Sequence, residues 1–215
     1  MKQLFSLIAI VTILTSCTDE DLIESSWDYS GFSPVESHQP FEDVQPAYDF
    51  DYWELVKHSP NQPETVQFRF GTVCKEADNP RKCTYNFFRI EETGIQFAEN
   101  SEEDQTYYYI KSNQRDYNKV WESVDELKTF LGTIDSEGDA LLLAAANGYF
   151  FAKDDRYMSG IRKKDDGYDV IGLKIVSTCE PYQINKFLLQ IDRNGNIESK
   201  DNAIFIDEMK KCTDR

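Results

Sequence analysis

The chain offers few side chains with which to build a catalytic site. It contains only two histidines, His38 and His58, and a catalytic triad or dyad needs a histidine held beside a serine or cysteine. His58 precedes Ser59-Pro60, a dipeptide typical of turns, so we expect its side chain to be exposed. The sequence carries no G-x-S-x-G, no H-E-x-x-H and no glycine-rich phosphate loop. These absences favour a non-enzymatic protein without a cofactor.

The 39 acidic residues leave one catalytic alternative open, which is the hydrolysis of a glycan by two carboxylates. With so many carboxylates, no spacing singles out a pair. Acidic doublets such as Glu91-Glu92 and Asp165-Asp166 are typical of solvated turns. A glycan hydrolase would need a deep cleft, rimmed by aromatic rings, with two acids roughly 5–9 Å apart.

Three consecutive tyrosines, Tyr107, Tyr108 and Tyr109, form a candidate surface for stacking on sugar rings. Alternate side chains of a strand point to opposite faces, so Tyr107 and Tyr109 would share one face and Tyr108 would lie on the other. The alternative is that one face belongs to the core and the other is solvated, with aromatic pairs between neighbouring strands.

Metal binding has weak support in the sequence. Zinc sites usually place cysteines close together with histidines nearby, and the chain has no C-x-x-C. The segment from Asp192 to Asn196 is faintly similar to a calcium loop, but Ala203 stands where such a loop carries its final glutamate. We therefore expect a β-turn there and no metal.

The first seventeen residues have the pattern of an export signal. Lys2 gives a positive start, and residues 4–14 are apolar except for Ser6 and Thr12, which is too short for a membrane span. The next residues, Leu14-Thr15-Ser16-Cys17, resemble the lipobox of bacterial lipoproteins. The resemblance implies that the Cys17 thiol receives diacylglycerol, that cleavage occurs just before it, and that the new amino terminus is acylated. An ordinary secretory signal with a chance cysteine is the alternative.

The residues that follow Cys17 indicate where the anchored protein resides. Thr18-Asp19-Glu20-Asp21 resembles the acidic signal that sends lipoproteins of Bacteroidota-type bacteria to the outer face of the outer membrane. The resemblance therefore implies an outer-membrane protein that faces the cell exterior. An anchor that faces the periplasm is the alternative.

Four cysteines remain after Cys17, and an even number in an exported chain predicts disulfides. They are Cys74, Cys83, Cys179 and Cys212. Three pairings are open, and the most economical joins Cys74 to Cys83 and Cys179 to Cys212. In this pairing we expect Cys74 and Cys83 to end two adjacent strands around the turn at Asn79-Pro80.

The formal net charge of −16 becomes −17 once Lys2 is removed with the signal. Such a surface repels nucleic acids and anionic lipid head groups, so membrane contact should come from the anchor alone. It attracts cationic partners. The favoured function is a binding module for a cationic protein or a glycan at the cell surface. A structural or accessory subunit of a surface complex is a further alternative, which predicts a large exposed apolar patch.

Residues 17–50 have the composition of a tether between the anchor and a single domain at 51–215. Residues 18–50 contain nine acidic residues, no lysine or arginine, and three prolines that interrupt regular structure. A pure spacer would not need the six aromatic residues found there. We expect partial docking of these rings on the domain, beginning near Phe41 or Tyr48, and partner binding is the alternative.

The domain pattern predicts strands, then two helices, then strands. Residues 65–70, 85–90 and 106–110 have strand character, as do residues 170–176 and 187–191. Asn194-Gly195 predicts a hairpin, and residues 203–206 form a last strand or helix. Ser123 and Glu126 form a capping box that starts one helix, and the apolar residues 140–146 form a second, buried helix. We expect an α+β fold with a mainly antiparallel sheet and an inserted helical hairpin.

Overall fold

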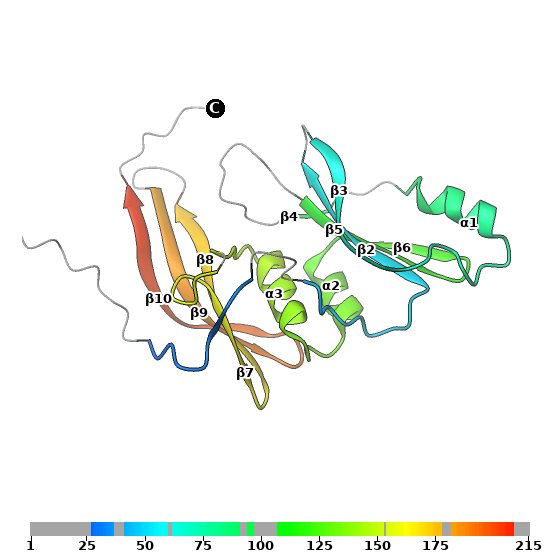
Figure 1. The fold of residues 1–215 in the computed structure, drawn as a ribbon. Helices are drawn as coiled ribbons and strands as arrows, with labels where there is room; N and C mark the ends of the chain where they lie inside the picture. The colour runs from blue at the N-terminus through cyan, green and yellow to red at the C-terminus, as the bar shows by residue number, and fades with distance from the viewer. Residues whose placement is uncertain are drawn as a thin grey trace, which may run out of the picture.

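The described residues form two antiparallel sheets and three short helices in the computed structural model (Figure 1). The structure describes residues 27–36, 41–59, 62–90, 94–96, 107–152, 154–177 and 182–208. Each strand pairing within the sheets is antiparallel. The expected α+β class with mainly antiparallel strands is therefore confirmed.

The first sheet, which we name the C-terminal sheet, has the strand order β1-β7-β8-β9-β10. Its strands are β1 (Ser33–Pro34), β7 (Gly160–Lys164), β8 (Gly167–Ser177), β9 (Tyr182–Asp192) and β10 (Ile197–Glu208). The predicted hairpin at Asn194-Gly195 joins β9 to β10, with Gly195 at φ 74°, where glycine is favoured. The Asp192 carboxylate accepts hydrogen bonds from the backbone amides of Asn194 and Asn196, both at 2.9 Å. These bonds form an ordinary turn, as expected, and residues 203–206 are part of a strand.

The second sheet, which we name the N-terminal sheet, has the order β3-β2-β5-β4, and β6 also pairs with β5. Its strands are β2 (Tyr52–Ser59), β3 (Gln62–Gly71), β4 (Ile95–Gln96), β5 (Tyr107–Gln114) and β6 (Tyr117–Trp121). The strand expected at residues 65–70 is confirmed as part of β3. Val66 and Phe70 are nevertheless exposed, because among the described strands β3 pairs only with β2 and lies at the edge of the sheet.

Two helices, α2 (Val124–Leu131) and α3 (Glu137–Ala146), lie between the sheets (Figure 1). The Ser123 hydroxyl accepts a hydrogen bond from the Glu126 amide at 3.2 Å, which confirms the predicted start of α2. The Glu126 carboxylate accepts from the amide of Glu122 at 3.1 Å, one residue earlier than a capping box requires. Helix α3 is buried from Gly138 to Ala146, as its apolar sequence predicts. One hydrophobic core therefore runs from the N-terminal sheet through both helices to the C-terminal sheet.

The strand expected at residues 85–90 is wrong, because helix α1 (Pro80–Phe87) includes residues 85–87 and a turn follows at residues 88–89. Asn79 caps the helix by accepting a hydrogen bond from the Lys82 amide at 3.1 Å, and Pro80 is at the first helical position. Cys83 and Phe87 are four residues apart and form the buried face. The helix-start signals and this spacing outweigh the strand preference of the aromatic residues.

The N-terminal segment docks on the domain earlier than expected, since Phe32 and Val35 are buried and β1 pairs with β7. The expectation that docking begins near Phe41 or Tyr48 is therefore wrong, because residues 27–36 already pack on the domain. The Arg162 guanidinium lies 4.3 Å from the centre of the Phe32 ring and donates to the Ser30 carbonyl at 2.9 Å. Burying an apolar side chain contributes about 1.5–3 kcal/mol, which exceeds the weak repulsion between solvated acids.

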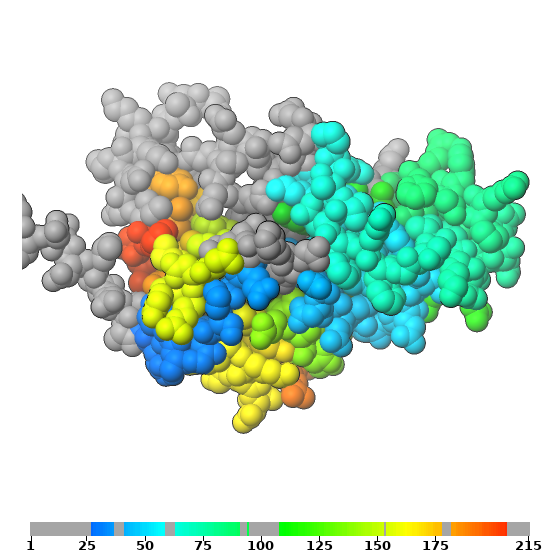
Figure 2. Space-filling model, in the orientation of Figure 1, coloured from blue at the N-terminus to red at the C-terminus, as the bar shows by residue number. Residues whose placement is uncertain are grey.

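The first described residue, Trp27, docks on the C-terminal sheet. Its indole nitrogen donates to the Asp201 carboxylate at 2.7 Å. The Lys186 ammonium lies 4.9 Å from the centre of the Trp27 ring and donates to the Tyr29 hydroxyl at 2.8 Å. Figure 2 shows the blue N-terminal segment, residues 27–36, lying against the yellow segment that precedes and includes β7. The domain thus includes residues that the sequence assigned to the tether.

Within the described residues, no helix is both long enough and apolar enough to cross a membrane.

Candidate functional site

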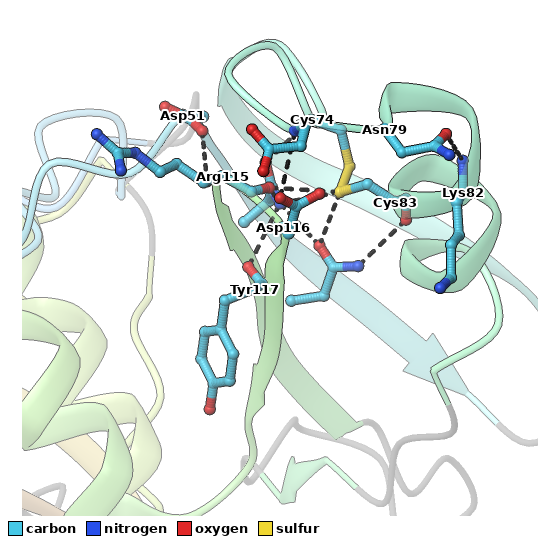
Figure 3. The surroundings of a disulfide bond; sticks show 11 residues. Asp51, Cys74, Asn79, Lys82, Cys83, Arg115, Asp116 and Tyr117 are labelled. Atoms are coloured by element: carbon cyan, nitrogen blue, oxygen red, sulfur yellow. Dashed lines mark hydrogen bonds between the residues drawn. A yellow bond between two sulfur atoms is a disulfide. The ribbon is translucent and has the colours of Figure 1, made fainter.

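The predicted disulfide between Cys74 and Cys83 is present and joins the loop after β3 to helix α1 (Figure 3). Its topology differs from the expectation, since Cys83 lies in a helix and not at the end of a strand. Cys17, Cys179 and Cys212 lie outside the described residues, so the second disulfide and the lipid attachment stay predictions.

The disulfide is surrounded by a structural hydrogen-bond network centred on the buried Asn113. The Asn113 side chain accepts from the Cys74 amide at 2.8 Å and donates to the Arg115 carbonyl at 2.7 Å. The Arg115 amide in turn donates to the Asp51 carboxylate at 2.6 Å (Figure 3). These bonds tie the disulfide loop to the turn after β5 and to Asp51 just before β2, so the network supports this end of the sheet.

The tyrosine surface predicted for ligand stacking is not formed by Tyr109. This side chain is 2% exposed, and Tyr108 on the opposite face is 8% exposed. Tyr108 belongs to the hydrophobic core, and β5 lies inside the N-terminal sheet, paired with β2 on one side and with β4 and β6 on the other. A ring with 2% exposure offers no face to a sugar. The side chain of Tyr107 lies outside the described residues.

An open groove of about 290 Å³ is the strongest candidate site in the described part of the chain. It lies between residues 42–50, which we name the groove segment, and the hairpin of β2 and β3. Ten residues line the groove: Glu42, Val44, Gln45, Pro46, Tyr48, Asp49, Phe50, Trp53, Phe68 and Phe70. Half of these residues are aromatic, which is typical of a binding site for a ligand with apolar or cationic groups.

The aromatic floor of the groove continues into the hydrophobic core. The Phe50 ring stacks on Phe130 of α2 with a centroid distance of 5.4 Å, and Trp53 lies 5.0 Å from Phe68. Above this floor, Tyr48 is 52% exposed and Phe70 is 59% exposed. The floor is therefore rigid, while two rings are available to a ligand.

The groove segment is held in place by the start of helix α3. The Asp139 carboxylate accepts a hydrogen bond from the Gln45 amide at 2.9 Å, and Asp43 accepts one from the Gly138 amide at 2.7 Å. A side chain at position 138 would meet the Asp43 carboxylate at 2.3 Å, so the close approach requires glycine. Phe130 accepts a further bond through its carbonyl from the Ala47 amide at 2.7 Å. These contacts fix one wall of the groove.

Burial of the Asp139 carboxyl raises its pKa to about 6 from an ordinary value of 3.8. The amides of Gln45 and Ser136 donate to this carboxyl and oppose the shift, but burial outweighs them. Asp139 is fully buried behind the groove segment and is not among the groove-lining residues. It is therefore a support for the groove wall and does not contact a ligand.

The groove can bind a ligand, but its chemistry does not favour hydrolysis. Glu42 and Asp49 are its two carboxylates, and both are exposed to solvent. A glycosidase needs a general acid in a protected position, and an open groove with exposed acids does not provide one. Among the described residues, no three acidic, histidine or cysteine side chains come together as a metal site requires.

The comparisons with known proteins give no relative of this chain: no family model, no curated protein and no solved structure matches it.

Proposed function

We propose that this protein is a lipid-anchored, non-enzymatic binding module of the outer membrane, facing the cell exterior, and that it captures a positively charged protein segment in the groove. The observation that carries the proposal is the groove itself, in which exposed Tyr48 and Phe70 stand beside exposed Glu42 and Asp49. Aromatic faces and carboxylates both attract the side chains of lysine and arginine.

The edge of the N-terminal sheet supports a protein segment as the ligand. Among the described strands, β3 pairs only with β2, so alternate residues of β3 present backbone groups on its outer side. An extended segment can add to such an edge while its side chains enter a neighbouring pocket. Phe68 and Phe70 belong to both β3 and the groove lining. The backbone of β3 and the aromatic rings of the groove can therefore contact the same ligand.

The long-range charge of the chain also favours a cationic partner. The net charge of −16 would accelerate the approach of a basic protein and would make the association weaken as salt is added. A neutral glycan would gain nothing from this field. The charge is thus the reason for preferring a basic protein segment to a glycan.

The lipid anchor would place the groove at the cell surface. Trp27 is the tenth residue after Cys17, so the chain between them spans at most about 35 Å. Since Trp27 docks on the C-terminal sheet, a lipid on Cys17 would hold this sheet near the membrane. The groove belongs to the other sheet and would face partners outside the cell.

Site-specific photocrosslinking in the producing cell tests the proposed groove. A photoreactive amino acid is placed at Tyr48 in one variant and at Tyr117 in the matched control, since Tyr117 is also exposed and does not line the groove. We expect crosslinks to lysine- or arginine-rich protein segments from position 48 only, and fewer of them at high salt. Equal crosslinking from both positions, or capture of acidic segments, would contradict the proposal. Crosslinks to a glycan and not to a protein would contradict the proposed protein ligand and would favour a glycan as the ligand of the groove.

A further inference from the structure

Helix α1 carries a positive surface on a strongly acidic protein. Residues 80–89 contain Arg81, Lys82 and Arg89 and no acidic residue, in a chain whose net charge is −16. All three cationic side chains are exposed. This concentration of positive charge has no part in the groove described above.

Two exposed aromatic rings accompany these cations. Tyr85 is 59% exposed and Phe88 is 66% exposed, whereas Cys83 and Phe87 on the other face of the helix are buried. Arg81 and Tyr85 are four residues apart in α1 and therefore lie on one side of the helix, and Arg89 follows in the turn after its end. The Arg89 guanidinium donates to the Tyr85 hydroxyl and lies 5.0 Å from the centre of its ring. We name Arg81, Lys82, Tyr85, Phe88 and Arg89 the cationic tip.

The cationic tip is rigid, although it protrudes from the molecule. The disulfide ties Cys83 to Cys74, and the Asn79 side chain caps the helix. Phe87 is fully buried and packs edge-on against Tyr52 at a centroid distance of 5.4 Å. A surface that is already ordered loses little conformational entropy on binding, so the tip is prepared for a ligand.

The cationic tip lies at the end of the molecule opposite the C-terminal sheet (Figure 1), and Figure 2 shows it at the surface. Trp27 docks on the C-terminal sheet, so a lipid on Cys17 would leave the tip remote from the protein's own membrane. The tip is therefore in a position to meet molecules in the medium.

We infer that the cationic tip binds an anionic polysaccharide, one whose sugars carry sulfate or carboxylate groups. A planar guanidinium binds these groups through paired hydrogen bonds, and Arg81 at the start of α1 and Arg89 just after its end each supply one. The exposed faces of Tyr85 and Phe88 supply apolar contact for sugar rings. The combination recognises charge and ring together.

The surroundings of the tip favour a flexible polymer over a flat anionic membrane. Glu76, Asp78 and Asp116 stand near the base of α1, and the Asp78 amide donates to the Asp116 carboxylate at 3.2 Å. A flat anionic membrane would present its charge to these carboxylates as well as to the cations, and the repulsion would weaken its binding. A single polysaccharide chain can contact the cations without contacting these carboxylates.

The test measures binding of the full-length protein in detergent to immobilised dextran sulfate and polygalacturonate, with neutral dextran as the reference. We expect both anionic polymers to bind and the neutral one not to bind. The double variant Arg81→Glu/Arg89→Glu should bind both anionic polymers at least about tenfold more weakly than the wild type. Its matched control is Lys163→Glu/Lys200→Glu, which changes the net charge by the same amount at two exposed lysines elsewhere and should bind far more strongly than the tip variant.

Three results would overturn the inference: equal loss of binding in the tip variant and its control, no preference for the anionic polymers over dextran, or binding to phosphatidylglycerol vesicles alone. Tyr85→Ala tests the ring separately and should weaken binding more than Tyr85→Phe, which keeps the ring face. Circular dichroism of each variant checks that the helix is retained. Tyr48→Ala, which alters the groove, should leave polymer binding unchanged. The proposal for the tip and the proposal for the groove can therefore be rejected independently.

Discussion

Replacing Phe130 by alanine is expected to lower the free energy of unfolding by about 3–5 kcal/mol. Phe130 is fully buried, and its ring centre lies 5.4 Å from those of Phe50 and Trp121 and 5.6 Å from that of Trp53. Removal of the ring leaves a cavity among three aromatic neighbours from different segments. Urea unfolding, followed by tryptophan fluorescence, measures the change.

The matched control for this substitution is Phe88→Ala, which removes the same side chain from an exposed position. The control should cost less than about 1 kcal/mol. Phe130→Ala should also weaken ligand binding in the groove, because Phe50 in the groove floor stacks on Phe130. Similar costs for the two variants would mean that the aromatic cluster is not the centre of the core.

Replacing Asp139 by asparagine is expected to change how stability depends on pH. The wild-type carboxyl has a pKa of about 6 when folded, against 3.8 ordinarily, because burial disfavours its charged form. A raised folded-state pKa means that this group favours folding fully below pH 3.8 and loses that contribution as pH rises through 6. The loss is up to about 3 kcal/mol. Asparagine does not ionise, so the variant should gain stability relative to the wild type by about this amount between pH 4 and 6.

Asp192→Asn is the control for this experiment, and its effect has the opposite sign. The Asn196 side chain donates to Asp192 at 2.8 Å, and this bond lowers the pKa of the carboxyl. A lowered folded-state pKa contributes stability at neutral pH that is lost as pH falls through the folded value. Asp192→Asn should therefore be more destabilising at neutral pH than in acid. Parallel pH curves for the wild type and Asp139→Asn would contradict the assignment of a buried carboxyl behind the groove.

The elements that the sequence predicted correctly are those specified by local signals. Ser123 and Gly132 mark the ends of α2, and Asn194-Gly195 forms its hairpin turn, as the cap and turn preferences require. The sequence does not specify helix α1 clearly, because two local signals disagree there. The aromatic residues favour a strand, whereas Asn79-Pro80 starts a helix and the disulfide at Cys83 helps to hold it. Giving the cap priority would have identified this helix.

The groove could not be predicted, because contacts between distant segments create it. The Gln45 amide reaches Asp139 across 94 positions of sequence, and Arg162 reaches Ser30 across 132. Nothing in the acidic, proline-containing segment 27–50 indicates these partners. The available signal was its unusual number of aromatic residues, of which Tyr48 and Phe50 line the groove. The same long-range contacts explain why part of the expected tether belongs to the domain.

The proposed role depends first on the lipid at Cys17, which would convert a folded acidic domain into a fixed surface receptor. Intact-mass spectrometry of the protein from membranes of the producing cell measures this most directly. We expect a chain that begins at Cys17 and is heavier than its sequence by the mass of a diacylglyceryl group and of an acyl chain on the amino terminus. A chain that begins at Met1 without modification, or one cut elsewhere with a free Cys17 thiol, would contradict it.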